Sequence, residues 1–445
     1  MTLDSQTLWD SVKNGVSNRS FRRQFRRSSD SSCNIAESFP HILPCFSQPT
    51  SNMTSIRSSV LHGVKDLRIE THQLPPPEPN DLQISVRTTG LCGSDLHYYH
   101  HFRNGDILVR EPLSLGHESA GIVEAVGSDV DGFEVGDQVA LEVGMPCETC
   151  ARCQEGRYNI CEAMRFRSSA RVFPHAQGTL QERINHPARW CHKLPHDVSL
   201  EHAALLEPLS VAVHASKRAK LKGGEKALVL GAGTVGLLVA TMAIIRGAES
   251  VVIADIDAGR VSFATNNGFA HAGFPIPLRR PNSNEESLVL AQETAESIKS
   301  KILASGSELG APDIVFECTG VPSCLQTAIF ATRPGGKVML IGMGNPVQTL
   351  PISAAALREI DLVGVFRYAD TYPEGITLVQ QTISNPNLPD ISKLITHRFE
   401  GLDSIKDAFE MAARSQDDSQ KMVLKVMMTM GEAPHHDLSG SNKRS

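Results

Sequence analysis

The stretch of sequence that decides the fold is Lys226-Ala-Leu-Val-Leu-Gly-Ala-Gly-Thr-Val-Gly236, which leads into a long apolar run. The uncharged segment from Ala227 to Ile245 has about the length of a membrane-spanning helix. Three glycines inside it favour another interpretation, namely a short buried strand, a tight turn and a buried helix. We therefore expect a strand–turn–helix unit here, and no membrane segment.

The glycines of this unit have the spacing G-x-G-x-x-G, and a second apolar run ends in Asp255. A strand before the motif, a helix after it and an acidic residue at this distance match the dinucleotide-binding fingerprint. Gly231 permits the tight turn, Gly233 the approach of a pyrophosphate to the helix N-terminus, and Gly236 close helix–strand packing. Asp255 would bind the ribose and repel a 2′-phosphate, and Ile256 follows it, so the pattern favours NAD over NADP. The alternative is a glycine-rich turn in a structural α/β unit.

Further short apolar runs follow this unit, and helical stretches separate most of them. Such alternation is typical of a parallel sheet, so we expect an α/β domain. The polar segment 278–307 is expected to be a surface excursion, helical in part. The expected strands of the sheet are Leu228–Leu230, Val251–Ile253, Ile314–Phe316 and Val338–Ile341.

The N-terminal half has a different pattern. Short alternating strands run from Val60 to Val86, broken by a proline-rich turn at Leu74–Pro79, and similar strands follow from Gly116 to Val139. Glycines at the bends of such strands are typical of a compact β-barrel. Residues 1–52 are rich in Ser and Arg and predict a disordered extension, and their four acidic residues speak against a mitochondrial transit peptide.

Composition limits the function classes. The chain has 445 residues, with 43 Lys and Arg against 49 Asp and Glu, and its formal net charge is −6. This length suggests about two or three domains. A mildly acidic chain offers no basic footprint for nucleic acid. The N-terminus has no apolar secretory signal, so we expect a cytoplasmic protein, in which clustered cysteines are interpreted first as metal ligands.

Four cysteines form the array C-x2-C-x2-C-x7-C, at Cys147, Cys150, Cys153 and Cys161. Tetrahedral zinc takes four soft ligands, and the x2 spacing lets neighbouring thiolates converge on one ion. Four thiolates close the coordination sphere, so the array predicts a structural zinc site. Disulfides or free core cysteines are the alternatives. A nucleic-acid zinc finger is disfavoured, because the neighbouring residues are not basic enough.

A second, catalytic metal site is the remaining hypothesis. Catalytic zinc keeps about three protein ligands and one open position. Cys92 and His117 are the natural first two ligands, and Glu118 or Glu207 could be the third. Asp95 is well placed to orient the imidazole ring of His117. Taken singly, each of these residues also has an ordinary structural interpretation.

Together these residues carry a family resemblance. Gly116-His-Glu-x2-Gly121-x5-Gly127-x2-Val130 resembles the zinc alcohol dehydrogenase signature of the medium-chain dehydrogenase/reductase superfamily. Three further segments resemble its polyol branch, the sorbitol (L-iditol 2-) and xylitol dehydrogenases; they are Cys92-Gly-Ser-Asp-x-His-Tyr98, Leu206-Glu-Pro-Leu-Ser210 and Gly364-Val-Phe-Arg-Tyr368. The resemblance covers about residues 53–430. Alcohol dehydrogenases usually have a cysteine at the position of Glu207.

The resemblance implies a GroES-like β-barrel catalytic domain and a Rossmann doubly wound domain, with two zinc ions and NAD. The catalytic zinc would be bound by Cys92, His117 and Glu118, with Glu207 at or near it through water. The expected substrate-binding residues are Tyr98, Glu207, Arg367 and Tyr368. The expected NAD-binding residues are Gly231, Gly233, Val235, Gly236, Asp255, Arg260, Ile341, Gly342, Met343, Val365, Phe366 and Arg367.

The predicted function is reversible oxidation of a secondary alcohol of a sugar alcohol, such as sorbitol or xylitol, to a ketose. Zinc would lower the pKa of the reacting hydroxyl, and Ser94 would take its proton first, followed by Glu207 or His97. A threonine-type dehydrogenase, a simple alcohol dehydrogenase and a non-catalytic relative are the alternatives. The loop Phe166–Gly178 is longer than in typical relatives, which leaves the preferred polyol open. Family members are commonly homotetramers.

The predicted organisation has five parts: a disordered extension (1–52), a catalytic domain with the zinc lobe (53–208), an NAD-binding domain (209–367), a return to the catalytic domain (368–430) and a polar tail (431–445). Glu207 precedes Pro208, whose ring disfavours a helical conformation of the residue before it. The sequence therefore predicts an extended backbone at Glu207.

Overall fold

The structure is a computed structural model, and it describes residues 53–431. The predictions of a disordered extension at 1–52 and of a polar tail beyond Gly431 lie outside these residues. In the described part of the chain, no helix is long and apolar enough to cross a membrane.

Antiparallel strands form the N-terminal half, as the alternating pattern predicts. One sheet has the order β2-β1-β6, and a larger one has the order β12-β8-β7-β3-β20-β19, with β11 paired to β3. The strands are β1 (Thr54–Gly63), β2 (Asp66–Leu74), β3 (Asp81–Gly90), β6 (Leu113–Ser114), β7 (Glu118–Val126), β8 (Gln138–Leu141), β11 (Arg183–Pro187) and β12 (Cys191–Lys193). Two-stranded ribbons are formed by β4 (Arg103–Asn104) with β5 (Ile107–Leu108) and by β9 (Gly144–Met145) with β10 (Arg165–Phe166).

Close crossing of strands β3 and β7 requires a glycine at Gly121. A Cβ atom there would lie 2.3 Å from the carbonyl oxygen of Ser85 and 2.7 Å from a methyl carbon of Ile84. No side chain fits in that space, which explains one glycine of the signature in packing terms.

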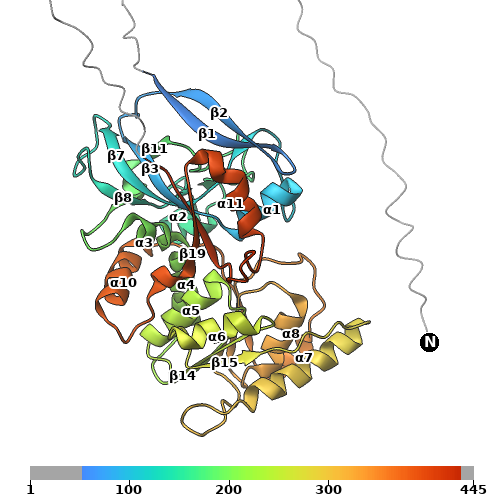
Figure 1. Cartoon of the computed structure of the whole chain (residues 1–445). Helices are drawn as coiled ribbons and strands as arrows, with labels where there is room; N and C mark the ends of the chain where they lie inside the picture. Colours follow the sequence, from blue (N-terminus) through green and yellow to red (C-terminus); the bar gives the residue numbers. More distant parts are fainter. Residues whose placement is uncertain (1–52, 432–445) are drawn as a thin grey trace, which may run out of the picture. The chain divides into compact units, whose positions relative to one another are not determined.

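The C-terminal part of the chain returns to this antiparallel sheet. Strand β20 (Lys425–Thr429) pairs with β3, and β19 (Ile395–Glu400) pairs with β20 in parallel. Figure 1 shows this in colour, because the red strands lie beside the blue ones. Segments more than 300 residues apart in the sequence therefore meet at one end of β3.

A six-stranded parallel sheet with the order β15-β14-β13-β16-β17-β18 forms the second half. This is the doubly wound order of dinucleotide-binding folds. The four predicted strands are confirmed as β13 (Lys226–Leu230), β14 (Ser250–Asp255), β16 (Ile314–Glu317) and β17 (Lys337–Leu340). The pattern missed β15 (Ala272–Pro275) and β18 (Asp361–Gly364), which are edge strands of four residues with little apolar signal.

Helices accompany this sheet and link it to the antiparallel half. Figure 1 shows α7 and α8 side by side, and residues 278–307 include α7 as predicted. The longer helices are α1 (Gly93–His101), α4 (Leu206–Ala219), α5 (Thr234–Ile245), α6 (Ala258–Asn266), α7 (Asn284–Lys299), α8 (Pro322–Ala331), α10 (Tyr372–Ser384) and α11 (Ile405–Ala412). Shorter ones are α2 (Ala151–Gln154), α3 (Leu200–Ala204), α9 (Ile352–Ala356) and the 3-10 turns η1 (Tyr158–Ile160), η2 (Ala188–Trp190), η3 (Ile391–Leu394) and η4 (Leu402–Ser404).

The glycine motif has the geometry that the sequence predicts. Strand β13 ends at Leu230, and Gly231 turns the chain with a φ of +100°, which a residue with a side chain rarely adopts. A Cβ atom at Gly236 would lie 1.8 Å from the carbonyl oxygen of Gly231. Glycine is therefore needed at Gly236 for helix α5 to pack against the turn.

Candidate active site and metal centres

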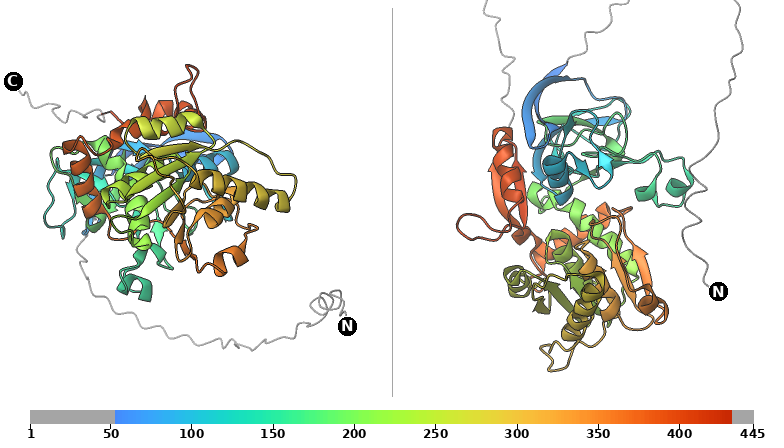
Figure 2. Two further views of the ribbon diagram at one scale, coloured as in Figure 1. Left: turned by 90° about the horizontal axis from the view of Figure 1, so that it is seen from below. Right: turned by 90° about the vertical axis from the view of Figure 1, so that its right-hand side faces the viewer.

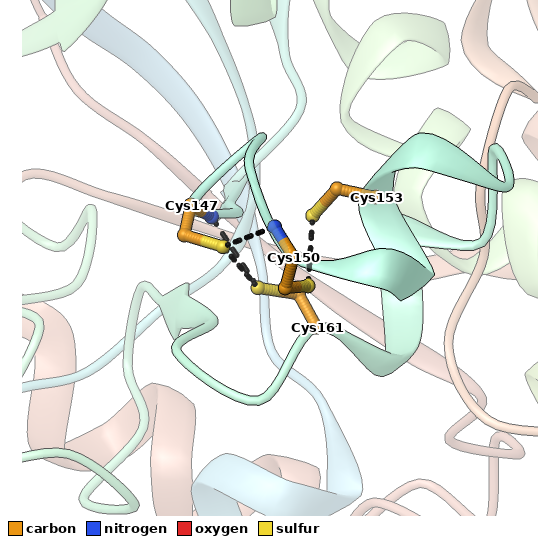
Figure 3. Close-up of side chains that lie close together, drawn as sticks. All are labelled: Cys147, Cys150, Cys153 and Cys161. Atoms are coloured by element: carbon orange, nitrogen blue, oxygen red, sulfur yellow. Dashed lines mark hydrogen bonds between the residues drawn. The ribbon is translucent and has the colours of Figure 1, made fainter.

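The four predicted cysteines of the array converge on one point. Their sulfur atoms all lie within 4.8 Å of one another, and Figure 3 shows the four side chains pointing inward from the loop before α2, from α2 itself and from the segment after it. Two sulfur pairs, Cys147–Cys161 and Cys150–Cys153, are 3.5 Å apart. Tetrahedral zinc with Zn–S bonds near 2.3 Å needs sulfur–sulfur distances of about 3.8 Å, so the group fits the ion.

Backbone N–H groups stabilise the thiolate form of the cysteines in this lobe, which is the form that binds metal. The Cys150 N–H donates to the Cys147 sulfur at 3.4 Å, and the Cys147 N–H donates to the Cys161 sulfur at 3.3 Å. Hydrogen bonds from Thr149 and Cys150 lower the pKa of the Cys147 thiol below its usual range. A thiolate is the form that binds zinc. Figure 2 shows the segment around α2, in teal, standing out from the strands.

A second group of ligand atoms lies at the N-terminal end of strand β7. Cys92 sulfur, a His117 ring nitrogen and a Glu118 carboxylate oxygen lie within 4.8 Å of one another. Cys92 caps helix α1, His117 directly precedes β7, and Glu118 begins it. A thiol, an imidazole and a carboxylate form a donor set that zinc accepts, with room left for a further ligand.

Asp95 orients this group. Its carboxylate lies 3.2 Å from Nδ1 of His117, and it also accepts hydrogen bonds from the backbone N–H groups of Cys92 and Gly116. The His117 ring therefore turns Nε2 toward the ligand group, where the Ser94 hydroxyl lies 3.5 Å away. Burial opposes protonation of His117, but the Asp95 and Cys92 charges raise its pKa well above the usual value. Neighbouring anions that stabilise this ring as a cation would also favour a bound metal cation.

Sequence reasoning missed the partner of Glu118. The Lys425 ammonium, on β20, donates to both oxygens of this carboxylate, at 2.6 and 2.7 Å, and to the Leu91 carbonyl at 3.0 Å. Both side chains are almost completely buried. A Cβ atom at Gly90 would lie 2.2 Å from Oε2 of Glu118, so only glycine fits beside this pair. Nothing in the sequence pattern links two residues 307 positions apart.

Glu207 lies nearby but outside the three-residue ligand group. Burial raises the pKa of its carboxyl to about 7, partly opposed by the charge of His117. The predicted extended backbone is wrong, because Glu207 lies in the first turn of helix α4. Pro208 is tolerated there, since a backbone N–H in the first turn has no partner inside the helix.

The predicted substrate-binding residues gather beside these carboxylates. The Arg367 guanidinium stacks on the Phe166 ring at 3.6 Å from its centre. The neighbouring Tyr368, Glu207 and Tyr98 raise the pKa of this guanidinium. Burial lowers the pKa of Arg367 to about 10, so it stays protonated at neutral pH. The Tyr368 hydroxyl is buried beside Glu207, whose pKa it lowers, and it has no well-formed hydrogen bond among the described residues. An unsatisfied hydroxyl beside a charged arginine suits a polar ligand.

The long loop Phe166–Gly178 is tied into the site, which the sequence did not reveal. The Ser168 hydroxyl donates to the Asp95 carboxylate at 2.6 Å, and the Ala170 N–H donates to the Tyr98 hydroxyl oxygen at 3.2 Å. Only the unusual length of the loop pointed to this region. The loop therefore helps to hold the residue that orients His117.

The predicted nucleotide-binding residues lie at the carboxyl ends of the parallel strands, where such folds bind ligands. A Cβ atom at Gly233 would meet no atom within 4 Å, so space is open in front of helix α5, whose first turn has no side-chain cap. Asp255 ends strand β14, and its carboxylate accepts hydrogen bonds from the Ala232 and Asp257 N–H groups. Val235, Ile341, Gly342, Met343, Val365, Phe366 and Arg367 follow neighbouring strands or begin α5, and Arg260 lies on α6, with its guanidinium on the Val423 carbonyl. An open helix N-terminus and an acidic residue at the end of the second strand are the features by which such folds bind a dinucleotide.

This combination of fold and sites defines a zinc- and nucleotide-dependent oxidoreductase. Residues 78–196 match the alcohol dehydrogenase GroES-like domain, and residues 234–381 match the zinc-binding dehydrogenase family. The chain belongs to this family of zinc-binding dehydrogenases. The predictions of a GroES-like domain with a Rossmann domain, and of zinc and NAD as cofactors, are thereby confirmed.

Similar proteins include polyol and sugar-acid dehydrogenases. A sorbitol dehydrogenase of Arabidopsis thaliana is 38% identical over 372 residues, which cover 83% of this chain and 94% of the relative. An L-idonate 5-dehydrogenase of Vitis vinifera is 37% identical, over 80% and 90% of the two chains. The crystal structure of L-idonate 5-dehydrogenase from Escherichia coli is similar with a TM-score of 0.70 and 25% identity, over 85% and 99% of the chains. The predicted resemblance to the polyol branch is confirmed.

Proposed function

We propose that this chain oxidises a secondary alcohol of a sugar alcohol to a ketose with NAD, and catalyses the reverse reduction. The observation that carries the proposal is the ligand group of Cys92, His117 and Glu118 beside Arg367 and the unsatisfied Tyr368 hydroxyl. The sorbitol dehydrogenase relatives support the same activity.

Each residue has a distinct role in this proposal. Cys92, His117 and Glu118 would hold zinc, which supplies Lewis-acid chemistry when bound by lowering the pKa of the substrate hydroxyl. Ser94, next to the His117 ring, would accept the proton first. Glu207, whose pKa of about 7 suits a group that gains and loses protons near neutral pH, would pass it onward.

The substrate would be held by polar contacts. Arg367 and Tyr368 offer hydrogen-bond donors to several hydroxyl groups, and the Tyr98 hydroxyl lies in the same group of side chains. A simple alcohol gives such donors nothing to bind, and leaving them unsatisfied costs free energy. This favours a polyol over the simple alcohol that an apolar cleft would take.

NAD would bind at the carboxyl ends of the parallel strands. Gly231, Gly233 and Gly236 shape the turn, and the N-terminus of α5 would meet the pyrophosphate. Asp255 would accept hydrogen bonds from the ribose hydroxyls. The nicotinamide supplies the redox chemistry, and the protein supplies its position.

A substrate panel tests the proposal. Purified, zinc-loaded protein would be assayed with NAD and sorbitol, xylitol, L-arabinitol, galactitol, L-idonate, threonine and ethanol. We expect kcat/KM for at least one polyol to exceed that for ethanol and threonine by about 10²-fold, the scale of a site that binds hydroxyl groups specifically. Preference for L-idonate would move the substrate to a sugar acid, and a preference for ethanol or threonine would reject the polyol assignment.

We also propose a homo-oligomer of four chains in a reducing compartment, the cytoplasm. Strand β18 ends the parallel sheet, and near it the apolar side chains of Val347 and Leu357 are 86% and 87% exposed. Burial of such side chains against a second copy of the chain would remove apolar surface from water. The described cysteines are all free, which suits a compartment that keeps thiols reduced. Light scattering of the purified chain and cell fractionation test these two proposals.

A further inference from the structure

We propose that the four-cysteine lobe controls the position of the substrate-binding arginine, and that Asn159 is the positioning residue. The inference rests on the proposed function, since it assigns Arg367 to the substrate. It adds a link between a metal site that has no room for substrate and the residues that bind substrate.

Two side chains of the lobe hold the segment that carries Arg367. The Asn159 amide donates through Nδ2 to the Phe366 carbonyl at 2.7 Å. The Tyr158 hydroxyl oxygen accepts a hydrogen bond from the Asp370 N–H at 2.8 Å. Phe366 and Asp370 stand on either side of Arg367 and Tyr368 in the sequence. The segment is therefore fixed at both ends by consecutive residues of turn η1.

The backbone between these two contacts is strained and needs support. Arg367 has a φ of 51° and Asp370 a φ of 52°, both in the left-handed region that residues with side chains rarely adopt. Such residues keep this conformation only where surrounding contacts impose it. The Asn159 and Tyr158 contacts are the hydrogen bonds that reach this backbone from the lobe. Losing one lets Arg367 relax away from its stacked position over Phe166.

The other side of turn η1 is anchored in the metal lobe. Cys161, two residues after Asn159, accepts the Cys147 N–H through its sulfur. Tyr158 is tied to the barrel as well, because its hydroxyl donates to the Glu142 carboxylate at 2.6 Å and its ring packs against Trp190. Closing the four cysteines on zinc would fix Cys161, and with it the position of Asn159. Substrate affinity would thus depend on a zinc ion that never touches substrate.

The positioning role predicts a specific kinetic change for Asn159→Ala. Asn159 is buried, 6% exposed, and its loss leaves the Phe366 carbonyl without this donor. We expect KM for the polyol to rise about tenfold, the effect of one buried hydrogen bond, while kcat changes less than about twofold. The content of two zinc ions per chain should stay unchanged. The matched control is Arg157→Ala, an exposed neighbour whose side chain makes no hydrogen bond in the described structure.

A double-mutant cycle separates positioning from a general structural effect. If Asn159 acts through Arg367, then Asn159→Ala should change KM less than about twofold in an Arg367→Leu background. If Asn159→Ala lowers the zinc content or the yield of folded protein, Tyr158→Phe replaces it, because it keeps the ring and removes only the hydroxyl, which holds Asp370 and also donates to Glu142. It should also raise KM for the polyol.

Three outcomes would overturn the inference while leaving the proposed function intact. These are an unchanged KM in Asn159→Ala and Tyr158→Phe, equal effects of Asn159→Ala in both backgrounds, or a loss confined to kcat. Failure of the proposed function looks different, because the unmodified protein would then oxidise none of the polyols in the panel.

Discussion

The two metal sites of this chain differ in the kind and the surroundings of their ligands. This difference assigns one site to the stability of the fold and the other to catalysis. The lobe of Cys147, Cys150, Cys153 and Cys161 takes four like ligands from 15 consecutive residues, with backbone N–H groups directed at sulfur. The site of Cys92, His117 and Glu118 takes three unlike ligands from two segments, with a lysine competing for one of them. A site with four protein ligands stabilises the fold. A site with three protein ligands, one of which also binds a lysine, can exchange ligands.

Removing a cysteine from the closed lobe should have the largest effect on stability. Cys150→Ser leaves three ligands, and we expect the free energy of unfolding to fall by about 4 kcal/mol or more, because binding of a structural metal contributes directly to folding. Cys92→Ser should abolish activity with a stability loss of about 1 kcal/mol or less. Denaturant unfolding with zinc analysis measures both. Similar stability losses in the two variants would erase the distinction between the sites.

Removing the lysine from the open site should have opposite effects with and without metal. Lys425→Met leaves the Glu118 carboxylate buried and uncompensated, so the metal-free protein should lose about 3–5 kcal/mol of stability. Zinc should bind this variant more tightly, because Lys425 no longer competes for Glu118. Chelator competition gives the affinity, and thermal unfolding of the metal-free protein gives the stability. Weaker zinc binding in Lys425→Met would show that Lys425 supports the metal site.

Glu207 tests the chemistry of the open site. Glu207→Gln keeps the shape but removes the charge and the basic function, so kcat should fall about 10²-fold, the usual scale for a positioned acid–base group. NAD affinity should stay nearly unchanged, because the nucleotide-binding turn lies elsewhere. Steady-state kinetics and NAD titration check this. A Gln variant with full kcat, unchanged KM and unchanged zinc content would leave Glu207 with no role.

The smallest of these effects should be a change in cofactor preference. Asp255→Ser combined with Ile256→Arg should shift the ratio of kcat/KM for NAD and NADP toward NADP by about tenfold or more, because arginine pairs with the extra phosphate. Neither metal site should lose zinc. Preference for NADP in the unmodified protein would remove the assigned role of Asp255.

The sequence predicted those parts of the site whose residues lie close together in the chain. The cysteine array and the glycine motif are local, so the spacing of their residues predicts their geometry. In the structure the four cysteine sulfur atoms converge, and the glycine motif forms the turn before helix α5. The Lys425–Glu118 pair and the Asn159–Phe366 contact join residues 307 and 207 positions apart, and no local pattern encodes them.

Glu207 shows a second limit of local rules. The preference of a residue before proline for an extended backbone is weaker than the packing of the first turn of α4, whose residues are mostly buried. Here the tertiary contacts of a helix outweigh the local preference. The length of the loop Phe166–Gly178 was visible in the sequence, but its contact with Asp95 through Ser168 was not, because contacts of a loop depend on the surface it meets.

Anomalous X-ray scattering at the zinc edge, from crystals of the purified chain with NAD, would show whether each chain holds one zinc ion at each of the two sites. We expect two peaks per chain, one among the four cysteine sulfur atoms and one beside Cys92, His117 and Glu118. A single peak confined to the four-cysteine lobe in metal-replete, active protein would contradict the assignment of the open site as the catalytic centre.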